Sequence, residues 1–222
     1  MTKDILQQLL AQPFIQQRYY TSDVDGSTFI NSYGVILLID TRLHVSNLSL
    51  IDFPDSFMGR CLITVDMKLN KTEILRIGTV HLESLHSAEE RQRQLNICRN
   101  FFTRSRATCI LMGDFNFNAH GQENICQFRG LSGWIDVWSH LMGTYDPGYT
   151  FDTETNAMTR ANNDMLDRSR IDRIILRSET FVPIEIEIIG TKSIGNEKRL
   201  NIYPSDHYGL TGVFEKNKKI KR

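Results

Sequence analysis

The chain has 222 residues, of which 41% are apolar and 23% are charged, and its formal net charge is zero. The length favours one domain or at most two, and the composition is that of a globular protein with a hydrophobic core. A protein that holds long duplex DNA by its phosphates carries a basic surplus. The balanced charge therefore argues against extended duplex binding and leaves a local contact with a nucleic-acid end, a single strand or a small phosphoester.

Neither a membrane span nor a secretory signal is predicted. The longest apolar runs are about six residues, against the roughly 20 that a membrane-spanning helix needs, and the segment after Met1 has no sustained apolar stretch. The cysteines lack the C-x-x-C spacing of a zinc site, and Cys61, Cys98 and Cys109 lie in apolar patterns typical of buried thiols. We expect an intracellular protein, nuclear or cytoplasmic, that acts as a monomer.

Strand patterns dominate the chain. In chain order we predict a short helix with Ile5, Leu9 and Leu10, strands at 33–39, 61–69 and 74–81, a helix at 87–102, a strand at 108–112, a helix at 135–141, and strands at 170–176, 184–188 and 208–214. The odd-numbered residues of 61–69 are apolar and the isoleucines of 184–188 alternate with glutamates, which indicates strands with one buried face. Strands with occasional helices are typical of a layered α/β or α+β sandwich.

The clearest helix begins at the capping box Ser87-Ala88-Glu89-Glu90. Leu95, Cys98 and Phe102 follow on one stripe of this helix. This segment is therefore predicted to cover one face of the sheet.

Gly113-Asp114-Phe115-Asn116 follows an apolar strand and is the first candidate for chemistry. A carboxylate and an amide two residues apart, at the end of a strand, can face one phosphate group or one hard cation. The alternative is an Asx turn that closes the strand. By itself the motif does not decide between the two.

Two further motifs lie at the openings of predicted strands. Ser205-Asp206-His207 offers a titratable imidazole, and Arg170-Ile171-Asp172-Arg173 offers a carboxylate that can orient an imidazole. Adjacent strand residues point to opposite faces, so Asp206 is not expected to hold His207. The alternatives are a turn with a surface histidine and a charged strand end.

Thr79-Val80-His81-Leu82-Glu83-Ser84 ends another predicted strand. His81 can donate a proton to a leaving group or hold a phosphoryl oxygen. The alternative is a structural histidine at a strand edge. The His-x-Glu spacing also occurs in zinc deaminases, but the downstream P-C-x-x-C that they need is absent.

Taken in order, H-L-E-S, G-D-F-N, R-I-D-R and S-D-H resemble the endonuclease/exonuclease/phosphatase superfamily. Three further segments are most similar to the tyrosyl-DNA phosphodiesterases of that superfamily: Ile135-Asp136-Val137-Trp138, Tyr149-Thr150-Phe151-Asp152-Thr153 and Ser205-Asp206-His207-Tyr208-Gly209-Leu210. The resemblance extends from about Leu9 to Phe214, nearly the whole chain.

The resemblance implies a role for each matched residue. Asp114 and Asn116 are expected at the phosphate, where Asp114 orients the attacking water, and Asp172 is expected to orient His207, which holds a phosphoryl oxygen. His81 is expected to stabilise the transition state and Asp206 to lie near the metal, Mg²⁺ or alternatively Mn²⁺. The expected substrate contacts are Ser84, His86, Asn118, Phe151 and Arg170. The five catalytic residues are predicted to converge on one pocket.

The chain also departs from the family pattern. The superfamily opens with a strand bearing an Asn motif and a second strand ending in Q-E, whose Glu is the main metal ligand, and neither segment is recognised here. We therefore expect residues 1–215 to form an N-terminally incomplete domain, and residues 216–222 to form a basic tail that is either an import or phosphate-binding segment or a solvated terminus. The tyrosyl-DNA enzymes have Arg where this chain has His86 and Asn118, and Trp where it has Phe151.

The fold we predict is the DNase I-like four-layered sandwich of two mixed β-sheets flanked by helices, lacking its first strands. The predicted function is Mg²⁺-dependent hydrolysis of phosphodiester bonds at nucleic-acid ends. One alternative is a phosphatase or phosphodiesterase of small phosphoesters. The other is a catalytically inactive partial domain, which the unrecognised Glu favours and the presence of the other motifs opposes.

Overall fold

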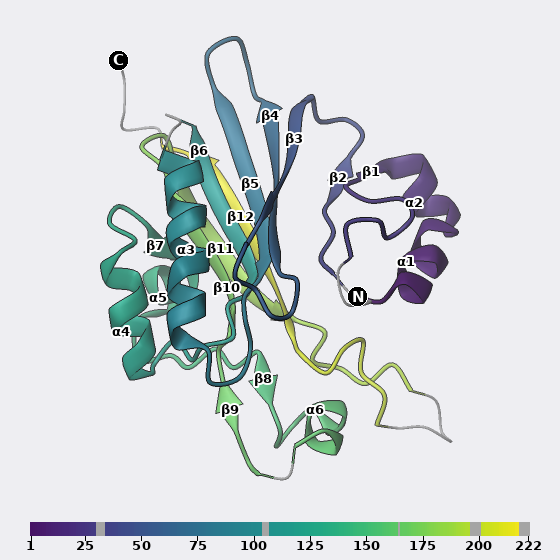
Figure 1. Cartoon of the computed structure of the whole chain (residues 1–222), viewed down its shortest axis with the longest axis vertical. Helices are drawn as coiled ribbons and strands as arrows, with labels where there is room; N and C mark the ends of the chain where they lie inside the picture. The colour runs from purple at the N-terminus through teal and green to yellow at the C-terminus, as the bar shows by residue number, and fades with distance from the viewer. Residues whose placement is uncertain (30–33, 104–106, 164, 196–200, 218–222) are drawn as a thin grey trace. The chain divides into compact units, whose positions relative to one another are not determined.

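The computed structural model describes residues 1–29, 34–103, 107–163, 165–195 and 201–217. The chain divides into two compact units, Met1–Phe115 and Asn116–Arg222. Figure 1 colours the first from purple to teal and the second from teal to yellow. In the part of the chain so described, every helix is too short or too polar to cross a bilayer.

The first unit opens with two short helices, α1 (Lys3–Leu10) and α2 (Pro13–Arg18). The Thr2 side chain accepts a hydrogen bond from the Ile5 amide and so caps α1. A small antiparallel sheet follows, in which β1 (Tyr19–Thr21) pairs with β2 (Leu38–Asp40). The strand predicted at 33–39 is thus shorter than expected within the described residues, and residue 33 lies outside them.

The main sheet of this unit consists of β3 (Val45–Asp52), β4 (Cys61–Lys68), β5 (Ile74–His81) and β6 (Thr108–Asp114). The pairs β3–β4 and β4–β5 are antiparallel, and β5 and β6 are parallel. A parallel pair needs a long crossover, and the helix α3 (Ala88–Thr103) supplies it (Figure 1).

Both faces of β4 are buried. On one face, Cys61, Ile63, Val65 and Met67 pack with Leu37 and Ile39 in one apolar cluster, as the alternation predicted. On the other, Leu62 and Thr64 are fully buried beside the α3 residue Phe102 and Gly78 of β5. The predicted last member of the alternation, Leu69, lies beyond the strand and is 40% exposed.

The second unit alternates short helices with short strands before it ends in a long hairpin. Its elements are α4 (Gln122–Arg129), β7 (Ile135–Asp136), α5 (Val137–Met142), β8 (Phe151–Asp152), α6 (Ala157–Ala161), β9 (Arg168–Ser169), β10 (Asp172–Arg177), β11 (Phe181–Ile189) and β12 (Gly209–Lys216). Antiparallel pairs join β10 to β7, β11 to β12 and β8 to β9.

Two predictions for this unit need correction. The helix predicted at 135–141 begins at Val137, because the Asp136 carboxylate accepts from the Ser139 amide and caps α5 while the backbone of Asp136 pairs in β7. The strict alternation predicted at 184–188 fails at Ile184, which is 45% exposed. A β-bulge between Pro183 and Glu185 places one extra residue in β11, so Ile184 turns outward.

Several elements were not predicted: the strand β3, the helices α2, α4 and α6, and the short strands β1, β8 and β9. Polar residues interrupt the apolar positions of β3, and most of its residues are exposed because it lies at one edge of the first-unit sheet. Of the basic tail, residues 218–222 lie outside the described residues, whereas Lys216 ends β12.

Candidate active site

In the first unit, His81 and Asp114 lie side by side at the carboxyl ends of β5 and β6. They are paired in register across the two parallel strands, and His81 Nε2 is 3.3 Å from Asp114 Oδ2. The Leu82 amide donates to the Asp114 carbonyl at 2.9 Å, which continues the pairing past the last residue of each strand. Two motifs distant in sequence therefore form one imidazole–carboxylate pair.

Gly113 is the residue that lets Asp114 come so close. Its φ is 131°, in the region that favours glycine, and a β-carbon there would lie 1.9 Å from the Val80 carbonyl oxygen. The glycine of the G-D-F-N motif is thus required by the approach of β6 to β5.

The H-L-E-S segment is anchored by the buried carboxylate of its own Glu83, which is 1% exposed. Glu83 accepts from Ser56 Oγ at 2.6 Å, from the Met58 amide at 3.0 Å and from Gln94 Nε2 at 3.0 Å. Arg91 of α3 donates to the Glu83 and Leu85 carbonyls at 2.8 and 2.9 Å. These bonds join α3 and the segment before β4 to the segment that carries His81.

The last residue of this segment and the loop that follows it carry two of the predicted substrate contacts. Ser84 donates to Met58 Sδ at 2.9 Å, and His86 is exposed. Leu85 between them has a φ of 62° and is 78% exposed. Arg60, from the segment before β4, places Nη1 2.8 Å from His81 Nδ1.

In the second unit, Asp172 and His207 form another imidazole–carboxylate pair. The distance from His207 Nδ1 to Asp172 Oδ2 is 3.0 Å. A carboxylate at this distance accepts a hydrogen bond from Nδ1–H. The proton therefore lies on Nδ1, and Nε2 faces away from Asp172. The Phe151 ring meets the imidazole edge to face, with centroids 5.3 Å apart and planes at 84°, which restrains the ring plane.

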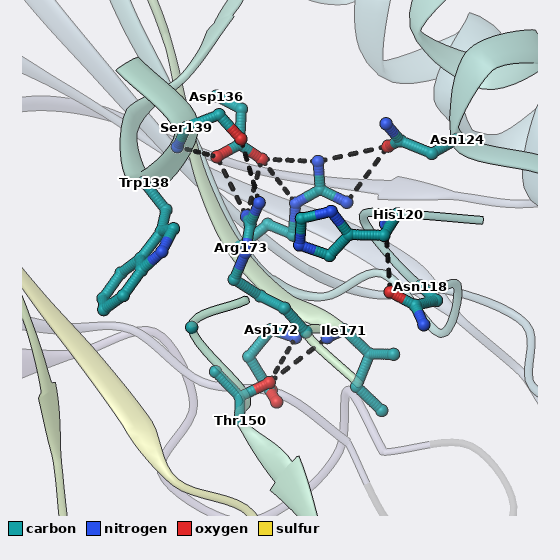
Figure 2. Close-up of polar contacts among 12 residues, drawn as sticks. Asn118, His120, Asn124, Asp136, Trp138, Ser139, Thr150, Ile171, Asp172 and Arg173 are labelled. Carbon is teal, nitrogen blue, oxygen red and sulfur yellow. Dashed lines mark hydrogen bonds and ion pairs between the residues drawn. The ribbon is translucent and has the colours of Figure 1, made fainter. Parts of the chain in front are cut away.

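Thr150 joins the two motifs that supply this pair, although no role was predicted for this residue. Its hydroxyl accepts from the Ile171 and Asp172 amides at 3.2 and 3.1 Å, as Figure 2 shows. Its carbonyl accepts from the Tyr208 amide at 2.7 Å. The side chain is fully buried, so Thr150 sets the separation of the segments that carry Asp172 and His207.

A buried ion cluster supports β10. Asp136 accepts from Arg170 Nη1 at 2.9 Å. It also accepts from Arg173 Nε at 2.6 Å, and Asn124 accepts from Arg173 (Figure 2). Burial raises the pKa of the Asp136 carboxyl, but Arg173 and Arg170 outweigh burial and hold that pKa below its ordinary value. Arg170 also donates to Ser139 Oγ at 3.0 Å and is 1% exposed.

Arg170 therefore has a structural role in this unit, because its guanidinium is bonded to Asp136 and Ser139. Its guanidinium lies against the Asp136 carboxylate and is buried, and the substrate contact predicted for Arg170 stays a prediction.

The S-D-H segment is fixed through its backbone by the α6 region. Asn156 donates to the Ser205 carbonyl at 3.0 Å, and the Thr159 hydroxyl donates to the Asp206 carbonyl. The Asp206 carboxylate accepts from Ser205 Oγ at 3.2 Å, and Asp206 is exposed. Such an anchored, exposed carboxylate suits a hydrated divalent cation.

Asn116 and Asn118 open the second unit. Asn116 has a left-handed φ of 54°, which asparagine tolerates better than most residues. Asn118 Oδ1 accepts from the His120 amide at 3.0 Å, an Asx turn visible in Figure 2. The turn anticipated as the alternative for G-D-F-N thus lies two residues beyond that motif.

The structure accordingly shows two imidazole–carboxylate pairs, one in each unit. The convergence of all five catalytic residues on one pocket stays a prediction. Sequence reasoning missed Arg60, Thr150 and Asn156. A lone arginine before a strand carries no signal, whereas Asn156 has the position of a helix N-cap and could have been recognised as one.

The class of fold is shown by solved structures. The fold is DNase I-like: an endonuclease/exonuclease/phosphatase family protein from Bacteroides thetaiotaomicron matches with a TM-score of 0.59 and 17% identity, over 81% of this chain and 67% of that one. No family model matches the chain.

Within that class, the chain is similar to tyrosyl-DNA phosphodiesterase 2. A crystal structure of D. rerio TDP2 complexed with single strand DNA product matches with a TM-score of 0.74 and 26% identity, over 94% of this chain and 80% of that one. The Mus musculus protein is 30% identical over 185 residues and the Gallus gallus protein 28% identical over 191. These matches cover 80% and 82% of this chain, which spans about half the length of the curated relatives it matches (47% and 49%).

Proposed function

We propose that this chain catalyses metal-dependent hydrolysis of phosphodiester bonds at nucleic-acid ends. The observation that carries the proposal is the presence of two imidazole–carboxylate pairs, His81 with Asp114 and His207 with Asp172. The similarity to tyrosyl-DNA phosphodiesterase 2, including a relative solved with a single strand DNA product, supports the same reaction class.

In this proposal both pairs act on one phosphoryl group. Asp114 orients the attacking water, and Asn116 binds a phosphoryl oxygen. His207, whose Nδ1 proton is held by Asp172, directs Nε2 at another phosphoryl oxygen. His81 donates a hydrogen bond to the charge that develops in the transition state. Preorganised donors of this kind stabilise developing charge at a phosphoryl centre.

The metal we propose is Mg²⁺, with Mn²⁺ as the alternative. The donors available are carboxylate and amide oxygens, which hard divalent cations prefer, and Asp206 is the residue assigned to hold the cation. The bound cation supplies neutralisation of the phosphoryl charge.

The proposed substrate contacts are Ser84, His86, Asn118 and Phe151. Phe151 can stack on a base, and the zero net charge suits a local contact with one end. His86 and Asn118 stand where the tyrosyl-DNA enzymes carry arginines, so we propose a weaker preference for a tyrosyl-linked end. The protein is proposed to act as a monomer in the nucleus or cytoplasm.

The test is a rate measurement with three substrates: a single-stranded oligonucleotide with a 5′-phosphotyrosyl end, bis(p-nitrophenyl) phosphate and p-nitrophenyl phosphate. Mg²⁺ should support hydrolysis of the first two, and EDTA should abolish it. Asp114→Asn should lower the rate by roughly 10²-fold or more, because it removes the carboxylate that orients the water. Glu179→Gln, in the exposed turn after β10, is the control and should keep full activity.

Four results would contradict parts of this proposal. Full activity of Asp114→Asn would exclude the assigned mechanism. Hydrolysis of p-nitrophenyl phosphate alone would favour the small-phosphoester alternative, and no turnover of any substrate with Mg²⁺ or Mn²⁺ would favour the inactive alternative. A strong tyrosyl-end preference, unchanged in His86→Arg and Asn118→Arg, would show that these two positions do not set the substrate choice.

A further inference from the structure

We infer that Arg60 is a positioning residue that fixes the tautomer of His81. A guanidinium donates hydrogen bonds and never accepts them. Arg60 Nη1 lies 2.8 Å from His81 Nδ1, so Nδ1 must be the accepting nitrogen and carries no proton. The single proton of the neutral ring then lies on Nε2, which points at Asp114 Oδ2 3.3 Å away.

Arg60 is held in place before any substrate arrives. Its side chain is only 7% exposed, and Nη2 donates to Met58 Sδ at 3.3 Å. Its backbone amide donates to Ser56 Oγ at 2.8 Å, and Ser56 in turn donates to the buried Glu83 carboxylate. Glu83 lies two residues beyond His81, so the same few bonds fix both the arginine and the histidine.

The surroundings of the imidazole agree with a neutral ring. A protonated imidazolium would turn an Nδ1 donor against the Arg60 guanidinium and place two positive charges in contact. Asp114 lies on the opposite side, with Oδ2 3.3 Å from Nε2, where it can accept a hydrogen bond from a protonated Nε2. Arg60 and Asp114 thus hold the ring from two sides and leave one arrangement of the proton.

The consequence is that the two histidines have opposite tautomers. Asp172 draws the proton of His207 to Nδ1, whereas Arg60 forces the proton of His81 to Nε2. His81 therefore acts as a hydrogen-bond donor and is prevented from serving as the general base. The role of His81 as a donor in phosphoester hydrolysis rests on the proposed function, whereas the tautomer of His81 does not depend on it.

The direct test is ¹⁵N NMR of the histidine ring nitrogens in the full chain without substrate. The His81 signals are identified by their loss in His81→Gln. In the wild type, Nδ1 should show the shift of an unprotonated nitrogen and Nε2 that of a protonated one. Arg60→Lys keeps a donor and should preserve this pattern, whereas Arg60→Met should produce a mixture or the opposite tautomer.

The kinetic test uses Arg60→Met and bis(p-nitrophenyl) phosphate. A misplaced proton should lower kcat by roughly 10–100-fold and leave KM within about twofold, with rescue in Arg60→Lys. If Arg60 instead binds substrate, KM should rise and the His81 spectrum should stay unchanged. Should Arg60→Met fail to fold, Ser56→Ala loosens the arginine without changing its charge and should broaden or mix the His81 signals.

A wild-type spectrum with protonated Nδ1, or the wild-type pattern in both Arg60→Met and Ser56→Ala, would overturn the inference whatever the activity. Failure of the proposed function would look different, because the tautomer pattern would be present in a chain that hydrolyses no phosphodiester. The two failures are therefore distinguishable.

Discussion

Gly113 passes so close to Val80 that a β-carbon on Gly113 would lie 1.9 Å from the Val80 carbonyl oxygen. This approach of β6 to β5 brings Asp114 level with His81. A methyl group at Gly113 would force the strands apart at the point where the imidazole–carboxylate pair forms.

Gly113→Ala should therefore destabilise the chain by more than the roughly 1 kcal/mol that a positive φ costs a non-glycine residue. Gly133→Ala is the matched control, because Gly133 also has a positive φ (82°) but meets no atom within 4 Å. Urea denaturation of both variants measures the difference. Equal losses of unfolding free energy would show that the contact with Val80 adds nothing to the backbone strain.

Thr150→Val should destabilise the second unit. The substitution keeps the shape of the side chain but leaves the partly buried Ile171 and Asp172 amides without their shared acceptor. An unsatisfied buried amide costs about 1–3 kcal/mol, and partial burial places the expected loss toward the lower end of that range. Thr150→Ser retains the hydroxyl and is the control. A Thr150→Val variant as stable as Thr150→Ser in thermal melts would contradict the role of this hydroxyl.

Asp172→Asn should lower kcat by roughly 10²–10⁴-fold, because an amide can hold the other tautomer of His207 while it preserves the packing. KM should change little if Asp172 acts through His207. Asp167→Asn, an exposed position outside the motifs, serves as the control, and equal rates for the two variants would remove Asp172 from the mechanism.

Asp23 should stabilise the first unit in a pH-dependent way. Burial raises the pKa of this carboxyl, but hydrogen bonds from the Thr28 hydroxyl and the Asp25, Thr28 and Gly26 amides outweigh burial and lower the pKa to about 2. A lowered folded pKa means that the stabilisation is present above the ordinary pKa of 3.8 and is lost as the pH falls toward 2. The stability gap between wild type and Asp23→Asn should be constant at neutral pH and shrink below about pH 4.

The measurement for Asp23 is a series of urea denaturations at several pH values. A stability gap that stays the same at pH values near 3 would show that the carboxylate charge is not what the loop stabilises.

Cys126 should be the thiol that reacts rapidly with a disulfide reagent under native conditions at mildly alkaline pH. Cys61, Cys98 and Cys109 are buried, and burial raises the pKa of Cys61 to about 11 and that of Cys98 further. The reactive thiolate is therefore scarce at these positions. Titration with Ellman's reagent should show one fast thiol, absent in Cys126→Ser, and the remaining thiols only after unfolding. Fast reaction of a second thiol would contradict the burial of these residues.

Local sequence signals determined the elements whose patterns were strong and short in range. The strand at 74–81 and the helix after Ser87 were predicted closely, because apolar periodicity and capping chemistry are local properties. The four motifs, and with them the likeness to a phosphoesterase, were also evident from residue order alone. The strand β3 was not predicted, and the alternation predicted for the bulged β11 was wrong at Ile184. The exposure of side chains in both strands depends on which strands they pair with.

Only the tertiary structure decided how the side chains of those motifs are held. The parallel register of β5 with β6 set His81 against Asp114, and a shared acceptor at Thr150 set Asp172 against His207. Arg60 and Arg170 show the same limit. Each is an arginine beside a strand in the sequence, yet one reaches His81 Nδ1 and the other a buried carboxylate. Hydrogen-bond partners far apart in the chain depend on strand pairing and burial, which no local pattern of residues encodes.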